Sequence, residues 1–151
     1  MPFTEDGRRV DLMLNLLAII NRTTSFPMYE LAITSICYQV RKKMASMDNY
    51  DDKEKLLFDI IYQFNEKQYE DHWKKYNKLS KDEKKDCIDD AIENGIAIHQ
   101  SPMWETKPIF YRLRDVLDKY PWLHPDDVYI NKWGRKIKTL SKVWVGQMYI
   151  L

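Results

Sequence analysis

The sequence predicts an α+β fold with a mainly helical middle of about four helices, flanked by extended or β segments at both ends. Two observations predict it: apolar residues follow helical spacing through the middle, and they alternate or run together near the ends. A length of 151 residues allows one domain. We divide the chain into an extended region over residues 1–25, a helical region over 26–120 and a β-rich end over 121–151.

The first region begins with turn chemistry and continues as apolar runs. Asp6-Gly7 suits a tight turn, because glycine tolerates a positive φ. Residues 10–14 are predicted to be a buried strand or extended run, and residues 16–20 form a second apolar run. The polar residues 21–25 are expected to lead into a helix whose free N–H groups Ser25 can cap.

The helical region is predicted to open with two long helices. Pro27 suits a first helical position, and the basic residues 41–43 close that helix. A second helix is predicted over residues 51–78, because an apolar stripe from Leu56 continues at helical spacing to Tyr76. The charged residues between its aromatic positions are interpreted as its solvated face.

Two further helices and a hairpin complete the expected elements. Residues 80–83 form a capping box that opens the third helix, which ends near Asn94-Gly95. Residues 96–98 are short and β-like, and the fourth helix is predicted over residues 109–119.

The last region is predicted to be β-rich. Alternation from Asp126 onward predicts a hairpin whose turn is formed by residues 132–135. Residues 143–145 form a further β-rich run, and the chain stops at Leu151 with no polar tail. We expect such an ending of a chain that is cut, or that pairs with something beyond itself.

Charge and composition exclude several classes of protein. Lys and Arg number 24 against 23 Asp and Glu, a net charge of +1, whereas an independent nucleic-acid-binding protein normally carries a positive excess. No apolar run is long enough to span a membrane and no leader opens the chain, so a soluble protein of the host-cell cytoplasm is expected. Aromatic residues make up 13%, which is high for a small domain, and some of these rings are expected to meet a partner.

The residues with reactive side chains do not form a self-contained active site. Cys37 and Cys87 are expected to be reduced and buried. The three histidines are scattered, which disfavours a zinc site, and the four glycines are isolated, which excludes a phosphate-binding loop. No catalytic and no metal-ligating residue is therefore predicted.

Two basic features can contact phosphate. Residues 132–142 interleave cations with tryptophan, and Lys136, Lys138 and Lys142 are candidate nucleic-acid contacts. The alternative is a hairpin whose lysine-rich edge prevents aggregation. Arg22 precedes a predicted helix, where an anion can meet both its guanidinium and free N–H groups; the alternative is a surface arginine.

Two stretches resemble a known family. Residues 1–15, MPFTEDGRRVDLMLN, resemble the "MP[YF]…(D/E)G…(V/P)D(I/L)…N" stretch of the β (second-largest) subunit of multisubunit RNA polymerases. Residues 143–151, VWVGQMYIL, are similar to the family's "V…VGYMY(M/I)LKL" segment, and residues 80–102 are similar to an interior stretch. The family continues its first stretch as "NPLGVPSRMN", whereas this chain has Leu16 for the proline and Ala18 for the glycine. Such departures resemble the split β subunits of large bacteriophages.

The resemblance implies a role for this chain inside a larger enzyme. Arg22 matches the family arginine that reaches the triphosphate of the incoming nucleotide, where it acts by position and charge rather than by proton transfer. The catalytic aspartates and their Mg²⁺ belong to the β′ subunit, so no cofactor is expected in this chain. The implied partners are β′-like and remaining β-like segments, with DNA template, RNA and nucleoside triphosphates in the assembled polymerase, and no activity is expected of the chain alone.

An alternative function is a stand-alone α-rich phage accessory module. Such a module would dock on a host protein through aromatic residues around Trp104, Trp133 and Trp144. A free adaptor has no reason to carry both end stretches in order, so the polymerase interpretation is preferred.

Overall fold

The protein is described by a computed structural model that covers residues 1–15, 17, 26–100 and 107–148. It consists of two compact units, which we call the terminal unit, Met1–Ile36 with Leu123–Leu151, and the helical unit, Cys37–Trp122. The described residues form five helices and a three-stranded antiparallel sheet, so the predicted α+β class is confirmed. None of the described helices has the length and apolar character needed to cross a lipid bilayer.

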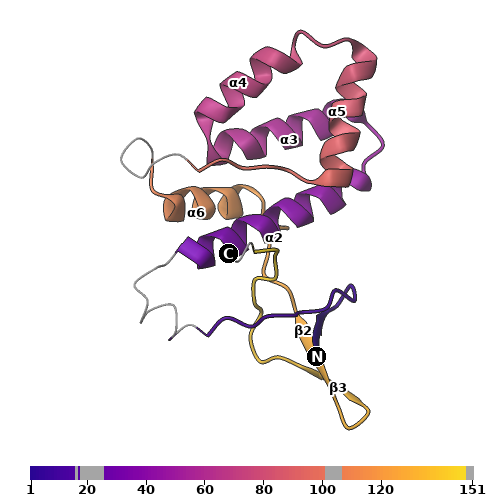
Figure 1. The fold of residues 1–151 in the computed structure, drawn as a ribbon, viewed down its shortest axis with the longest axis vertical. Helices are drawn as coiled ribbons and strands as arrows, with labels where there is room; N and C mark the ends of the chain where they lie inside the picture. Colours follow the sequence, from indigo (N-terminus) through magenta and orange to yellow (C-terminus); the bar gives the residue numbers. More distant parts are fainter. Residues whose placement is uncertain (16, 18–25, 101–106, 149–151) are drawn as a thin grey trace. The chain divides into compact units, whose positions relative to one another are not determined.

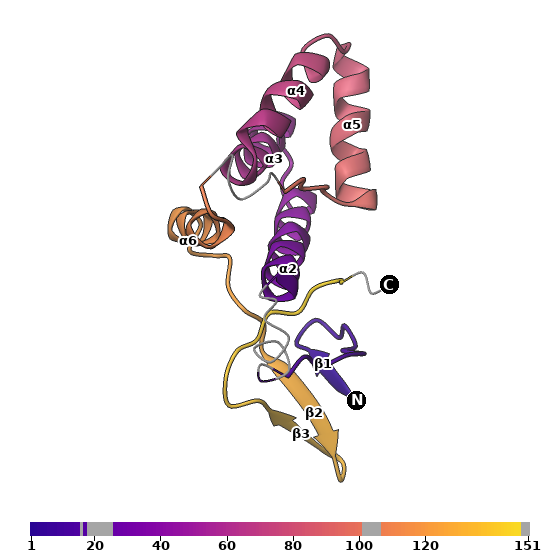
Figure 2. The same cartoon turned by 60° about the vertical axis from the view of Figure 1, so that its left-hand side comes forward.

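The sheet belongs to the terminal unit and joins the two ends of the sequence. Strand β1 (Pro2–Thr4) pairs with β2 (Val128–Lys132), which pairs in turn with β3 (Arg135–Lys138) (Figure 2). The predicted hairpin is confirmed, and both turn residues between β2 and β3, Trp133 and Gly134, have a positive φ. Two such residues form the turn whose twist matches paired strands.

Residues 10–14 do not form the buried strand that their apolar character suggested. The structure assigns them no strand, and Leu12 and Met13 are 55% and 73% exposed. The strand near the N-terminus is instead β1, which was not predicted because its pairing partner lies more than 120 residues away in the sequence. The predicted turn is present, since the Gly7 N–H donates to the Thr4 carbonyl at 3.0 Å.

The helix α2 (Phe26–Ala45) begins where the sequence predicted, with Pro27 in its first turn. The boundary between the two units falls within this helix, after Ile36. Ile36, Val40 and Met44 are fully buried along it. Ser25, the expected cap, lies outside the described residues.

The predicted helix over residues 51–78 is wrong, because two helices occupy this stretch: α3 (Tyr50–Phe64) and α4 (Glu66–Tyr76) (Figure 1). Asn65 separates them with an extended backbone at φ −154° and ψ 102°, and its side-chain oxygen accepts the Gln68 N–H at 3.0 Å. Its amide also donates to the His99 carbonyl at 2.7 Å. The break is stabilised by a helix cap and by a contact that the local sequence does not reveal.

The remaining helices match the sequence closely. The capping box of Ser80 and Glu83 opens α5 (Lys81–Asn94), and α6 (Ile109–Lys119) follows at its predicted position. The β-like residues 96–98 form no strand, because their polar backbone is bound elsewhere: Gln68 donates to the Ala97 carbonyl at 2.7 Å. Cys37 is buried as expected, whereas Cys87 is exposed, and the buried residue of α5 is its neighbour Ile88.

Candidate functional site

The residue with the most specific predicted role, Arg22, lies outside the described residues. The same holds for Trp104 and for residues 149–151 of the second end motif. We use "end motifs" for residues 1–15 and 143–151, and the described parts of both belong to the terminal unit.

The end motifs are joined through Asp126. The Arg8 guanidinium of the first motif lies 3.3 Å from an Asp126 carboxylate oxygen. The backbone of Asp126 exchanges two hydrogen bonds with Val143 of the second motif, at 2.8 and 3.0 Å. Two segments separated by more than 120 residues in the sequence are therefore connected by one residue between them.

Asp126 is half-buried at this junction. Burial raises the pKa of its carboxyl, and the neighbouring Arg8 guanidinium opposes that shift. Its second oxygen is buried and accepts no hydrogen bond from the residues that the structure describes. This carboxyl therefore serves mainly as the counter-ion of Arg8.

The second end motif also contacts α2 at a glycine. A Cβ atom at Gly146 would lie 2.6 Å from the Leu31 carbonyl oxygen and 3.0 Å from the Ser35 nitrogen. Real side chains do not approach backbone this closely, so only glycine permits the contact. Leu31 and Ser35 lie in the first three turns of α2, the helix that follows Arg22 in the sequence.

Two of the three lysines named as nucleic-acid contacts are engaged within the sheet. Lys136 and Lys138 share the sheet face of Tyr129. The Lys136 ammonium lies 4.0 Å from the centre of the Tyr129 ring and 5.3 Å from that of Phe3. Lys138 donates to Asp127 at 2.9 Å, and this hydrogen bond lowers the pKa of Asp127 and raises that of Lys138. Lys142 is exposed, and its charge contributes to lowering the pKa of Asp127.

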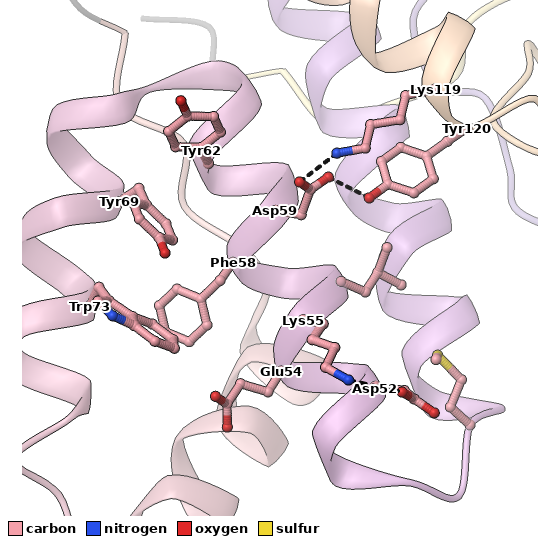
Figure 3. A pocket seen from close by; sticks show the side chains of 12 residues that line it. Asp52, Glu54, Lys55, Phe58, Asp59, Tyr62, Tyr69, Trp73, Lys119 and Tyr120 are labelled. Carbon is pink, nitrogen blue, oxygen red and sulfur yellow. Dashed lines mark hydrogen bonds and ion pairs between the residues drawn. The ribbon is translucent and has the colours of Figure 1, made fainter.

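The helical unit contains a groove that the sequence did not predict. It has a volume of about 760 Å³ and lies along α3, between aromatic side chains of α3 and α4 on one side and the end of α6 on the other (Figure 3). Its aromatic side is built from Phe58, Tyr62, Tyr69 and Trp73. The sequence carries this signal as rings at i and i+4 on the second predicted helix, where their spacing predicts only a continuation of the apolar stripe.

The described residues contain no group of three His, Cys, Asp or Glu side chains able to hold a metal ion. No protein-family model matches the chain, and no curated protein matches it either. The end motifs, the charge pattern and the groove are the features of the chain that bear on its function.

Proposed function

We propose that this chain is a segment of a β-like subunit of a multisubunit DNA-directed RNA polymerase of bacteriophage type. It contributes scaffold, and through Arg22 a contact to the triphosphate of the incoming nucleotide, to RNA synthesis in the host cytoplasm. Its partners in this role are the β′-like and remaining β-like segments, and the Mg²⁺ of the reaction is held by another subunit. The chain alone is inactive.

The observation that carries the proposal is the meeting of the two end motifs. Arg8, Asp126 and Val143 connect them, and Gly146 packs the second motif on the helix that follows Arg22. Sequence stretches that resemble one polymerase subunit in the same order thus belong to one folded unit. An arginine placed before α2 suits phosphate, because its guanidinium is permanently charged and binds two oxygens at once.

The surface of the terminal unit supports a role inside an assembly. Fifteen large apolar side chains among the described residues are exposed, and twelve of them belong to the terminal unit. In the proposed assembly these side chains are available to contact neighbouring segments. The near-zero net charge agrees with this role, because a polymerase assembles its positive channel from many segments.

The test is to co-express the chain with the remaining β-like and β′-like segments and to purify the complex. Replacing Arg22 by Ala leaves the complex assembled but raises the apparent nucleotide KM or slows elongation at least tenfold, since charged hydrogen bonds are worth about 1.5–3 kcal/mol. Arg9→Ala is the control: Arg9 is largely exposed and pairs only with the exposed Asp11 among the described residues.

The two parts of the proposal, the nucleotide contact and the polymerase assignment, are tested by different outcomes. Elongation by the Arg22→Ala complex with unchanged KM and rate would remove the nucleotide contact. Failure of the chain to copurify with the other segments would remove the polymerase assignment itself.

One observation favours the adaptor alternative. Trp133 is 89% exposed at the tip of the hairpin, where a docking side chain is expected. An adaptor remains a soluble monomer at high concentration without polymerase segments, and Trp133→Ala abolishes its binding to the host protein. If the Trp133→Ala chain still copurifies with the polymerase segments, the adaptor alternative is excluded.

A further inference from the structure

The groove of the helical unit has one strongly aromatic side. Tyr69, Trp73 and Tyr76 follow one another along α4 as a ladder of nearly parallel rings, with interplanar angles of 13° and 19°. Phe58 of α3 meets all three rings edge-on, at centroid distances between 4.8 and 6.1 Å. Phe58 is buried beneath them, whereas Tyr69 and Trp73 stay partly exposed and line the groove (Figure 3).

On the opposite side of the groove, the carboxylates are paired with lysines. Asp59 accepts a hydrogen bond from Lys119 at 2.6 Å and another from the Tyr120 hydroxyl. Asp52 lies 3.9 Å from Lys55 on the exposed face of α3. Each of these carboxylates therefore already has a cation beside it.

Glu54 differs from these carboxylates. It lies on the same side of α3 as Phe58 and Trp73 (Figure 3), and one carboxylate oxygen accepts the Tyr76 hydroxyl at 2.9 Å. Burial and this carboxylate raise the pKa of Tyr76, so Tyr76 remains a neutral donor. Among the described residues no Lys or Arg lies within ion-pair distance of Glu54, and its other oxygen accepts no hydrogen bond.

A carboxylate beside partly exposed aromatic faces is the chemistry that recognises a cationic side chain. The chain uses the same interaction internally, since the Lys84 ammonium lies 5.1 Å from the Tyr76 ring centre and that of Lys53 lies 4.7 Å from Tyr50. A guanidinium fits this site better than an ammonium, because it is planar, stacks on rings and can bind a carboxylate through two N–H groups.

We propose that the groove of the helical unit binds an arginine-bearing segment of a partner polypeptide. The guanidinium stacks on Tyr69 and Trp73 and pairs with the free oxygen of Glu54. The groove volume of about 760 Å³ holds the side chains of a short segment and not a domain. This binding is independent of the polymerase assignment, whose motifs belong to the terminal unit.

The test measures binding of fluorescent peptides to the full chain by anisotropy. Three peptides share one glycine–serine sequence and carry arginine, lysine or glutamate at the same positions. The arginine peptide is expected to bind most tightly, the lysine peptide at least threefold more weakly, and the glutamate peptide not at all. The ranking follows from the stacking and bidentate pairing that only arginine provides.

Glu54→Gln isolates the proposed ion pair, because glutamine keeps an acceptor for Tyr76 and loses the charge. We expect it to weaken binding of the arginine peptide at least tenfold. The control Glu70→Gln removes the same charge from an exposed position of α4 outside the groove and leaves binding unchanged. Trp73→Phe keeps a ring against Phe58 and weakens binding several-fold by reducing the stacking face.

Three outcomes would overturn the proposal. One is equal binding of the arginine and glutamate peptides, or binding of neither. The second is an equal loss in Glu54→Gln and Glu70→Gln, which indicates general electrostatic attraction. The third is unchanged affinity in both Glu54→Gln and Trp73→Phe, with thermal unfolding curves like that of the unaltered chain.

Discussion

The helical unit and the terminal unit are stabilised in different ways. Twelve of the seventeen buried apolar residues described belong to the helical unit, which exposes only three large apolar side chains. The terminal unit buries five and exposes twelve. The helical unit therefore encloses most of the buried apolar residues described, whereas the terminal unit leaves most of its large apolar side chains exposed.

The hydrogen bonds show the same contrast. In the helical unit, side chains bind backbone carbonyls in the last turns of other helices: Arg41 donates to the Ile92 and Glu93 carbonyls of α5, and the buried Arg112 donates to the Gln63 carbonyl of α3 at 3.0 Å. In the terminal unit, distant segments pair backbone to backbone through β1, β2 and the Asp126–Val143 bridge. The terminal unit therefore depends on strand register and on close backbone approach more than on the volume of buried apolar side chains.

The largest expected effect is in the helical core. Ile60→Ala removes a fully buried side chain of α3 and should lower the free energy of unfolding by about 2–5 kcal/mol. Denaturant unfolding followed by far-UV circular dichroism measures this loss. Burial raises the pKa of the Cys37 thiol to about 12. Alkylation of Cys37 therefore reports the same unfolding.

The matched variant in the terminal unit is Ile137→Ala. Ile137 is 47% exposed on β3, so its truncation should cost less than about 0.5 kcal/mol. Equal losses in the two variants would contradict the contrast between the units.

A smaller loss of stability is expected where the backbone at Gly146 packs closely against α2. Gly146→Ala places a Cβ against the backbone of Leu31 and Ser35, so residues 143–148 must shift away from α2. The expected cost is about 1–3 kcal/mol, measured from the denaturant midpoint. Gln147→Ala, at the exposed neighbouring position, should change the midpoint little. A Gly146→Ala protein as stable as the parent would refute the packing of this segment.

The smallest effect is a pH dependence with opposite signs at two adjacent carboxyls. Burial raises the pKa of Asp126, so the folded state holds its proton more tightly than the unfolded state, and stability falls as pH rises from the ordinary carboxyl pKa through the raised one. The hydrogen bond from Lys138 lowers the pKa of Asp127, so its contribution is present above the ordinary pKa and is lost as pH falls through the lowered one.

Stability measured against pH for Asp126→Asn and Asp127→Asn separates the two contributions. Relative to Asp126→Asn, the parent loses stability as pH rises through the Asp126 window. Relative to Asp127→Asn, the parent gains stability as pH rises through the Asp127 window. Parallel curves for the parent and both variants would contradict these assignments.

The features that the sequence predicted correctly are local ones. The capping box of Ser80 and Glu83 and the hairpin turn at Trp133-Gly134 need only residues within four positions of one another. The features it missed depend on distant partners. The local sequence around Asn65 predicts helix, whereas the break at this residue depends on the hydrogen bond that its side-chain amide donates to the His99 carbonyl. Strand β1 likewise has no strand pattern of its own and forms by pairing with β2.

The candidate sites divide in the same way. The sequence by itself determined the fold class, most helix positions, the basic hairpin and the end motifs. Periodicity, helix caps and turn residues depend only on residues that are close together in the sequence. Only the tertiary structure decided that Arg8, Asp126 and Val143 join those motifs and that Gly146 must be glycine. It also decided that Glu54, beside the rings of α4, has no cation partner among the described residues. These are properties of atoms brought together across the chain, and no local pattern in the sequence records them.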